Sequence, residues 1–356
     1  MKHTPLASLK GGILFAIALC LIMLSSSATF SQISGERLFE VTASKHLFGA
    51  SVDILAYHPE VQSCKLAFYH AFKEMERIER LLSSQLSTSE IARVNRNAGR
   101  EPVKVSYETF ALLKRAVRFA QRSEGAFDVS IGPISELWGF SSEREVVVPA
   151  ADSIKALLWL VDYRKLRLNA KDTTVAFTAP GMRLDLGGAG AGYAVDRAVA
   201  LLKAKGLKNF LINASGDIYA FGRKANQEKW RVGVQHPRNA EALLAKVALT
   251  DHAIATSGDY ERCILVEGKR YHHIFDPLTG YPAEGSASVT VVAPTSEEAD
   301  MWSTYVFIIG YLKFRQQKNH PHIKALVMAS DGKVEYDAEL RRDFELELLT
   351  QGSNGE

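Results

Sequence analysis

Polar side chains and glycines gather in several short stretches whose residue types could bind a phosphorylated ligand. Asp300 and Thr304 lie four residues apart, a spacing that places a carboxylate and a hydroxyl on the same face of a helix. Such oxygen atoms are the ligands that hard cations such as Mg²⁺ prefer. The other candidate stretches are residues 125–128, 213–217, 256–260 and 271–280. Each alone could be an ordinary turn, so it is their combination that indicates a ligand site.

The glycine-rich stretch at residues 187–192 could bring backbone N–H groups close to phosphates at the start of a helix. It does not match the dinucleotide-binding fingerprint, because glycines at positions i, i+2 and i+5 are absent in every register. The acid Asp185 also precedes this loop, whereas the fingerprint has its acid about 20 residues after the loop. A tight turn between a strand and a helix is the alternative interpretation.

The first 31 residues have the features of a secretory signal peptide. Lys2 and Lys10 precede an apolar run at residues 13–24, and small or polar residues follow it. The run is about a dozen residues long, shorter than the roughly 20 residues of a membrane-spanning helix. We therefore expect cleavage near Ala28 or Ser31 and an exported, periplasmic protein.

The cysteines leave the redox state of the mature protein open. Cys20 lies inside the signal segment, and Leu19 stands where a small residue would precede a lipidated cysteine, so a lipoprotein anchor is not favoured. Cys64 and Cys263 remain after cleavage, and an oxidising compartment would permit a disulfide between them without requiring one.

The mature chain is expected to form one large unit. Without the signal segment it has 41 basic and 40 acidic side chains, a net charge of about +1, which gives no indication of nucleic-acid binding. Residues 32–350 are expected to form a single domain of two lobes without a clear linker, followed by a polar tail at residues 351–356. Helical and strand patterns alternate without a regular βαβ rhythm, which predicts an α+β fold of mixed or antiparallel sheets with packed helices.

The predicted elements follow from the spacing of apolar residues. Helical spacing predicts helices at residues 62–82, 107–123, 152–161 and 193–205, and from residue 296 onward. Asp152 or Ser153 would cap the third helix, and Ser296 with Glu298 the last. Short apolar runs predict strands at residues 52–56, 165–168, 174–178, 210–212, 229–235, 243–249, 254–257, 261–266 and 288–293.

Taken together, these stretches resemble the FAD:protein FMN transferase family, also called the ApbE family, from about residue 48 to residue 310. The most specific parts are residues 185–196, 213–217, 256–260, 273–282 and 300–304. The resemblance implies one Mg²⁺ ion held by the side chains of Asp300 and Thr304 and by the backbone carbonyl of Gly188. FAD would be the substrate. His273, positioned by the turn at residues 276–277, would be the base for the incoming hydroxyl, whereas the neighbouring His272 would be structural.

The resemblance also implies a set of residues that contact the flavin nucleotide. These are Phe48, Gln85, Ala126, Phe127, Asp128, Asp185, Ala191 and Ile274. The sequence departs from the family pattern at three of them. Ala191 replaces a frequent lysine, Gln85 replaces a frequent aromatic residue, and Phe48 begins a segment that commonly reads Met-Gly-Thr.

These departures leave three outcomes open. As a transferase, the protein would attach FMN to a Ser or Thr hydroxyl of an exported or membrane redox protein and release AMP. As an Mg²⁺-dependent FAD pyrophosphatase, it would release FMN and AMP, and as a non-catalytic carrier it would only bind FAD. Association with a membrane would then be peripheral, through the acceptor, and the sequence identifies neither that acceptor nor the oligomeric state.

Overall fold

Two antiparallel strands and a long helix open the main part of the fold. The computed structural model describes residues 32–33, 36–140, 146–317 and 320–349. Strand β3 (Phe39–Leu47) pairs with β4 (Ala50–His58) across Phe48 and Gly49, whose positive φ angles of 55° and 77° reverse the chain. Helix α1 (Val61–Leu82) follows and buries one apolar face in the core.

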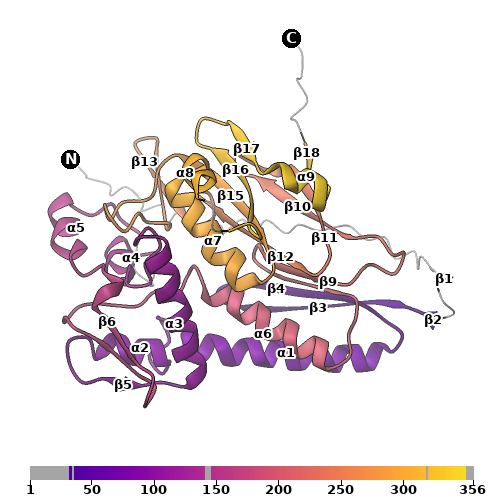
Figure 1. Cartoon of the computed structure of the whole chain (residues 1–356), viewed down its shortest axis with the longest axis horizontal. Coiled ribbons are helices and arrows are strands. Elements are labelled where there is room, and N and C mark those ends of the chain that lie inside the picture. Colours follow the sequence, from indigo (N-terminus) through magenta and orange to yellow (C-terminus); the bar gives the residue numbers. More distant parts are fainter. Residues whose placement is uncertain (1–31, 34–35, 141–145, 318–319, 350–356) are drawn as a thin grey trace, which may run out of the picture. The chain divides into compact units, whose positions relative to one another are not determined.

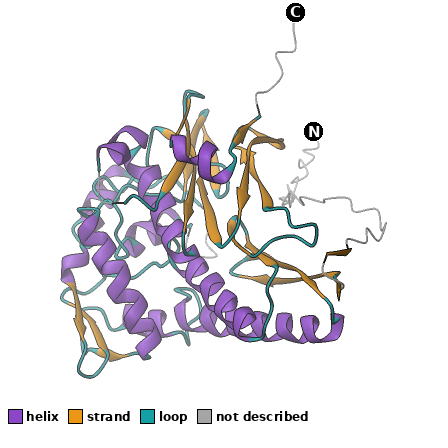
Figure 2. Ribbon diagram, turned by 45° about the vertical axis from the view of Figure 1, so that its right-hand side comes forward, coloured by secondary structure: helices purple, strands orange, loops and turns teal. Residues whose placement is uncertain are grey.

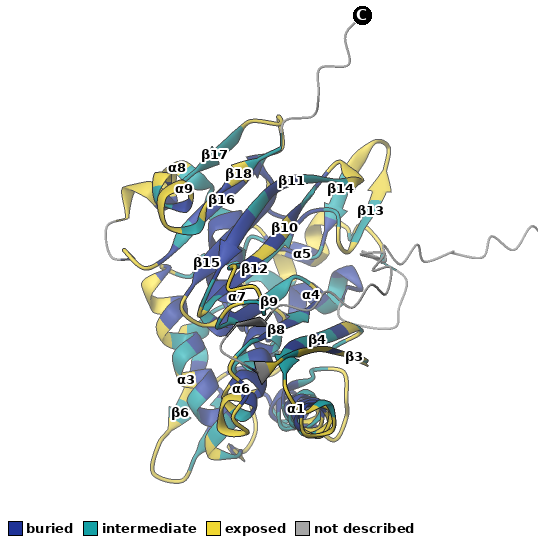
Figure 3. Cartoon of the chain, turned by 90° about the vertical axis from the view of Figure 1, so that its right-hand side faces the viewer, coloured by how far each residue is buried: buried dark blue, intermediate teal, exposed yellow. Residues whose placement is uncertain are grey.

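An eight-stranded sheet lies at the centre of the described residues. Its further strands are β8 (Phe210–Ala214), β9 (Asp217–Phe221), β12 (His252–Gly258), β15 (Ser286–Ala293), β16 (Lys324–Ala329) and β17 (Val334–Tyr336). The strand order is β17, β16, β15, β12, β9, β8, β4, β3, and each neighbouring pair is antiparallel. Every residue of β15 is buried because both faces of the sheet are covered there (Figure 3). The predicted α+β fold with antiparallel sheets is confirmed.

Helices cover one face of the central sheet, and a second sheet covers the other. Helix α6 (Gly190–Ala204) packs against α1, while α7 (Ser296–Ile309) packs against α6, β12 and β15 (Figure 1). Strands β10 (Trp230–His236), β11 (Asn239–Leu249) and β18 (Glu347–Leu348) form the second sheet. Strand β12 shows the alternation that this requires, since Ala253 and Ala255 belong to the core under the helices and Ile254 to the core under the second sheet.

Shorter elements complete the described chain (Figure 2). The remaining helices are α2 (Glu90–Arg96), α3 (Tyr107–Arg122), α4 (Gly132–Trp138), α5 (Ala151–Leu158), α8 (Tyr311–Gln316), α9 (Ala338–Phe344) and the 3₁₀ turn η1 (Tyr163–Lys165). The remaining strands are β1 (Gln32–Ile33), β2 (Glu36–Arg37), β5 (Val103–Lys104), β6 (Leu166–Asn169), β7 (Thr174–Phe177), β13 (Cys263–Val266) and β14 (Lys269–His272).

The predicted ends of three helices need correction. Helix α5 ends at Leu158 and its N-cap position is Ala150, so neither Asp152 nor Ser153 caps it. Helix α6 begins at Gly190, inside the glycine-rich stretch, three residues before the predicted start at residue 193. The cap of α7 is Thr295, whose hydroxyl accepts the Glu298 N–H at 3.3 Å.

The structure also bears on the cysteines, on membrane-spanning helices and on the terminal segments. Cys64 and Cys263 are both free thiols. Among the described residues, no helix is long and apolar enough to span a membrane. The predicted signal segment and the polar tail at residues 351–356 lie outside the described residues.

Candidate active and metal-binding site

The glycine-rich loop lies directly against helix α7. A β-carbon placed on Gly188 would lie 2.9 Å from Thr304 Oγ1 and 3.2 Å from Phe127 Cε2. Only a glycine can therefore occupy this position without moving its neighbours. The contact brings together three segments that are distant in the sequence, namely the loop after α3, the glycine loop and α7.

Gly192 brings Asp300 to the same place. Its backbone N–H donates a hydrogen bond to Asp300 Oδ2 at 3.2 Å. A β-carbon on Gly192 would lie 2.3 Å from the carbonyl oxygen of Ser296 and 2.9 Å from Asp300 Cβ, so α6 and α7 approach each other closely here. The structure thus brings together Gly188, Asp300 and Thr304, the residues that the resemblance assigned to the metal.

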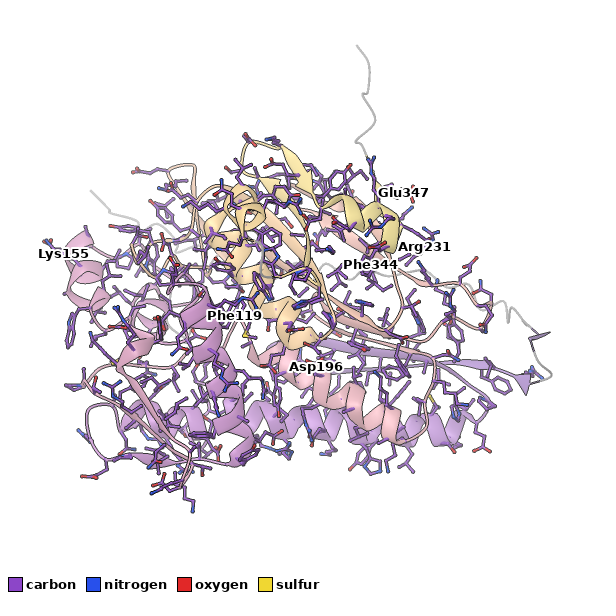
Figure 4. All side chains as sticks on the ribbon, viewed as in Figure 1. Phe119, Lys155, Asp196, Arg231, Phe344 and Glu347 are labelled. Atoms are coloured by element: carbon purple, nitrogen blue, oxygen red, sulfur yellow. The ribbon has the colours of Figure 1, made fainter. Side chains whose placement is uncertain are left out.

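Two polar contacts fix the N-terminal turn of α7. Asp196 on α6 accepts the backbone N–H groups of Ser296 and Glu297 at 2.8 and 2.9 Å, through its two carboxylate oxygens. These N–H groups are among those that a helix cannot satisfy internally. Arg115 on α3 donates two hydrogen bonds to the Glu297 carboxylate at 2.6 and 2.8 Å. Figure 4 shows Asp196 where α6 meets α7.

The site gathers carboxyl groups that disfavour one another's ionised form. Burial raises the pKa of Asp300 well above its usual value, and the nearby Asp217 carboxylate raises it further. Burial also raises the pKa of Asp217 to about 7, with a contribution from Asp196. The described residues form no ion pair with Asp300 or Asp217. A cation would therefore offset a repulsion that the protein alone leaves uncompensated.

This arrangement fits a hard divalent cation. The groups that could hold it are the Asp300 carboxylate, the Thr304 hydroxyl and a backbone carbonyl of the glycine loop, all of them oxygen donors. The described residues contain no group of three or more His, Cys, Asp or Glu side chains that could hold a metal. Mg²⁺ usually takes only a few protein ligands and keeps several coordination positions for water or phosphate.

Residues 126–128, which were predicted to line the flavin pocket, lie beside the glycine loop, where Phe127 contacts the position of Gly188. Phe127 is buried and packs edge-to-face on Phe119, with ring centroids 5.1 Å apart. The neighbouring Ala126 is half-buried. The Asp128 carboxylate accepts hydrogen bonds from Ser130 N, Ser130 Oγ and Tyr163 N at 2.7 to 2.8 Å. Because these bonds use its lone pairs inside the protein, Asp128 shapes the loop.

The remaining predicted flavin contacts are spread over several elements. Asp185 Oδ1 accepts the Gly187 N–H at 2.9 Å, and Ala191 is half-buried in the first turn of α6. Phe48 is half-buried and its N–H donates to Glu79 Oε1 at 2.7 Å. Gln85 is exposed and Ile274 is buried.

The backbone carbonyl of Arg262 contacts both the backbone and the ring of His273. The backbone N–H of His273 donates to the Arg262 carbonyl at 3.2 Å, and its Nδ1 lies 3.3 Å from the same oxygen. Since a carbonyl only accepts, Nδ1 carries the proton and Nε2 keeps a free lone pair. Burial and the Arg262 guanidinium lower the pKa of His273 to about 3, so the ring stays neutral. The Arg262 carbonyl is an additional contact of His273, and its positioning by the turn at residues 276–277 stays a prediction.

His272 has the structural surroundings that were predicted. The side chain is buried, its Nε2 lies 3.0 Å from the Ala283 carbonyl, and its ring packs edge-to-face on Phe307. The sequence did not predict roles for Asp196 or Asp217, although both lie in stretches that it singled out. Their parts in the site depend on how β9 and α6 pack against α7.

Comparisons with known proteins point to one family. A profile described as the ApbE family matches residues 48–327. An FAD:protein FMN transferase from Treponema pallidum is 35% identical over 288 residues, covering 76% of this chain and 79% of the relative. An FAD:protein FMN transferase from Escherichia coli K12 is 30% identical over 264 residues, covering 73% of this chain and 75% of the relative.

Solved structures agree with these matches. The apbe protein of Thermotoga maritima superposes with a TM-score of 0.79 at 32% identity, covering 86% of this chain and 98% of that one. The flavin transferase ApbE of Vibrio cholerae superposes with a TM-score of 0.76 at 26% identity, covering 86% and 99%. The fold and the sequence similarity therefore each extend over most of the chain.

Proposed function

The chain belongs to the ApbE family, and we propose that it transfers the FMN half of FAD to a Ser or Thr hydroxyl of another protein. The relatives named FAD:protein FMN transferase support the assignment as a flavinyltransferase with FAD as its substrate. Its dependence on Mg²⁺ and the chemistry of its acceptor are parts of the same proposal. The observation that carries it is the convergence of Gly188, Asp300 and Thr304 into one oxygen-rich site.

In the proposed reaction, the acceptor hydroxyl oxygen attacks the phosphorus of the FMN half. A bond forms between that oxygen and phosphorus, the bond from phosphorus to the bridging oxygen breaks, and AMP leaves with the electron pair. His273 Nε2 takes the hydroxyl proton, because its partner Nδ1 is already engaged with Arg262. Magnesium, held by Asp300, Thr304 and the Gly188 carbonyl, would neutralise charge on the diphosphate oxygens.

The flavin itself would be held beside the glycine loop. The proposed contacts are Phe48, Gln85, Ala126, Phe127, Asp128, Asp185, Ala191 and Ile274. Phe127 supports this because its ring edge reaches the position of Gly188 while its other side packs on Phe119. Asp128 would act through the loop that its hydrogen bonds stabilise.

We place the reaction in the periplasm, after cleavage of the signal segment near Ala28 or Ser31. The acceptor would be an exported or membrane redox protein with an accessible Ser or Thr. Contact with the membrane would then be peripheral and indirect.

The proposal is tested by incubating the protein with FAD, Mg²⁺ and co-expressed candidate acceptors. After denaturation, mass spectrometry should find an acceptor heavier by one FMN minus one water, together with free AMP. Asp300→Asn should abolish the adduct, because an amide is a poorer ligand for Mg²⁺ than a carboxylate.

Two other outcomes would reject transfer. Free FMN and AMP without an adduct would identify an FAD pyrophosphatase, which the departures at Ala191 and Gln85 leave open. Intact FAD bound to a yellow protein, with no AMP at any Mg²⁺ concentration, would identify a flavin carrier.

A further inference from the structure

A row of three hydroxyl groups connects strand β12 to the metal-binding face of α7. Ser257 Oγ lies 2.8 Å from Ser303 Oγ and 3.5 Å from Thr304 Oγ1. Ser303 Oγ in turn donates to the backbone carbonyl of Asp300 at 2.9 Å. The row therefore links Ser257 to the Thr304 side chain directly and, through Ser303, to the backbone of Asp300.

Each hydroxyl has one proton, and this sets the direction of the row. Ser303 uses its proton on the Asp300 carbonyl, because a carbonyl only accepts. The short Ser257–Ser303 contact must then be donated by Ser257. Ser257 has no second proton to give, so at its contact with Thr304 it can only accept.

We propose that Ser257 is a positioning residue, which draws the Thr304 proton toward β12 and turns the Thr304 lone pairs toward Gly188. A cation needs lone pairs, and a hydroxyl whose proton points at the cation would be repelled by it. Gly188 lies beside this hydroxyl, since a β-carbon there would be 2.9 Å from Thr304 Oγ1. The inference rests on the proposed function, because it assumes that Thr304 binds Mg²⁺.

The same strand supplies a matched control. Thr256 precedes Ser257 and points to the opposite face of the sheet, where its Oγ1 lies 2.8 Å from Thr290 Oγ1 on β15. Ser257→Ala and Thr256→Val each remove one partnered hydroxyl from β12. Only the first of them interrupts the row that leads to Thr304.

The test measures Mg²⁺ binding directly, by titration calorimetry of the full chain with MgCl₂ and without any acceptor. Ser257→Ala is expected to raise the Mg²⁺ Kd by about tenfold or more, the usual effect of losing a group that orients a metal ligand. Thr256→Val and the conservative Ser257→Thr should bind as the unchanged protein does. In FAD turnover, Ser257→Ala should require more Mg²⁺ and regain its rate when Mg²⁺ is saturating.

The outcomes separate this inference from the proposed function. An unchanged Mg²⁺ Kd in Ser257→Ala overturns the positioning role, as does an equal loss in Thr256→Val, which would indicate a general effect on the sheet. Failure of the unchanged protein to bind Mg²⁺ overturns it as well. If Mg²⁺ binds as expected but no acceptor is modified, the transferase proposal fails and the role of Ser257 stands.

Discussion

His273 is the residue whose surroundings specify its chemistry most closely. The Arg262 carbonyl fixes the proton on Nδ1, which leaves the Nε2 lone pair free to accept a proton. We expect His273→Ala to slow FMN transfer by about 100-fold or more, the usual contribution of general base catalysis. FAD binding, measured by quenching of flavin fluorescence, should stay within a few-fold of the unchanged protein.

A second histidine variant controls for the loss of an imidazole. His322 lies before β16 and faces Glu298 at 3.6 Å, so His322→Ala should leave transfer unaffected. Full transfer activity in His273→Ala would remove His273 from the mechanism. A parallel loss of FAD binding would show instead that His273 holds the substrate.

Single-residue roles could be predicted only where they depend on local spacing. The separation of Asp300 and Thr304 places both on one face of any helix, and the structure shows them so. Asp217 and Ser257 belong to β9 and β12, and they reach the site because both strands lie under α7. That packing leaves no signal in the spacing of neighbouring residues, so their parts in the site could not be predicted.

At the level of elements, the site depends on the close approach of α6 and α7. Gly192→Ala would put a β-carbon 2.3 Å from the Ser296 carbonyl oxygen, so the two helices would have to separate. We expect a loss of about 1–3 kcal/mol in the free energy of unfolding, typical of overpacking. Mg²⁺ affinity should fall as well, because Gly192 N–H also holds Asp300. Urea denaturation and calorimetry measure the two effects.

The glycine loop contains its own control for this variant. A β-carbon on Gly190 would meet its nearest neighbour, Leu186 Cβ, at an ordinary contact distance of 3.8 Å. Gly190→Ala should therefore be neutral or slightly stabilising, since alanine favours a helix over glycine by up to about 1 kcal/mol. If both variants are equally stable, close packing at Gly192 does not hold α6 against α7.

The long helices were predicted closely, the short helix α5 only approximately and the shortest ones not at all. Helices α1 and α3 match the predicted ranges to within one residue, because many turns of apolar spacing define one face. Helices α2 and α4 have seven residues each, too few for a periodic signal, and no prediction was made for them. The cap of α7 falls on Thr295 rather than Ser296 because several residues around it could serve as caps.

For the whole molecule, the order of the strands in the central sheet could not be predicted from the sequence. Strand β4 pairs with β8, which lies far along the chain and beyond six of the α-helices that the structure describes. Alternating apolar residues identify a strand but not its partner. The α+β class was therefore predictable, whereas the arrangement that brings residues 125–128, 185–192 and 300–304 together was visible only through the family resemblance.

Buried acids and buried histidines across the whole protein determine how its stability should respond to pH. Burial raises the pKa of Asp196 to about 6, and that of Asp300 is also raised, so these groups favour folding at low pH and lose that contribution as pH rises. Burial lowers the pKa of His272, His273 and His320, whose contribution is lost as pH falls below about 6.5. These effects oppose each other, so the dependence of stability on pH alone does not report on the site. The change in Tm that Mg²⁺ produces at each pH does.

Mg²⁺ should stabilise the protein more at pH 8 than at pH 5. Burial raises the pKa of Asp300, so protons compete more strongly with Mg²⁺ for its carboxylate as the pH falls, and a neutral carboxyl group is a poor cation ligand. With Mg²⁺ at about 100 times its Kd, binding adds about 2.7 kcal/mol, so Tm at pH 8 should rise by several degrees. Differential scanning calorimetry with MgCl₂ or EDTA measures this shift, which Asp300→Asn should abolish at both pH values. Equal shifts at pH 5 and pH 8 in the unchanged protein would mean that Mg²⁺ binds elsewhere than beside Asp300.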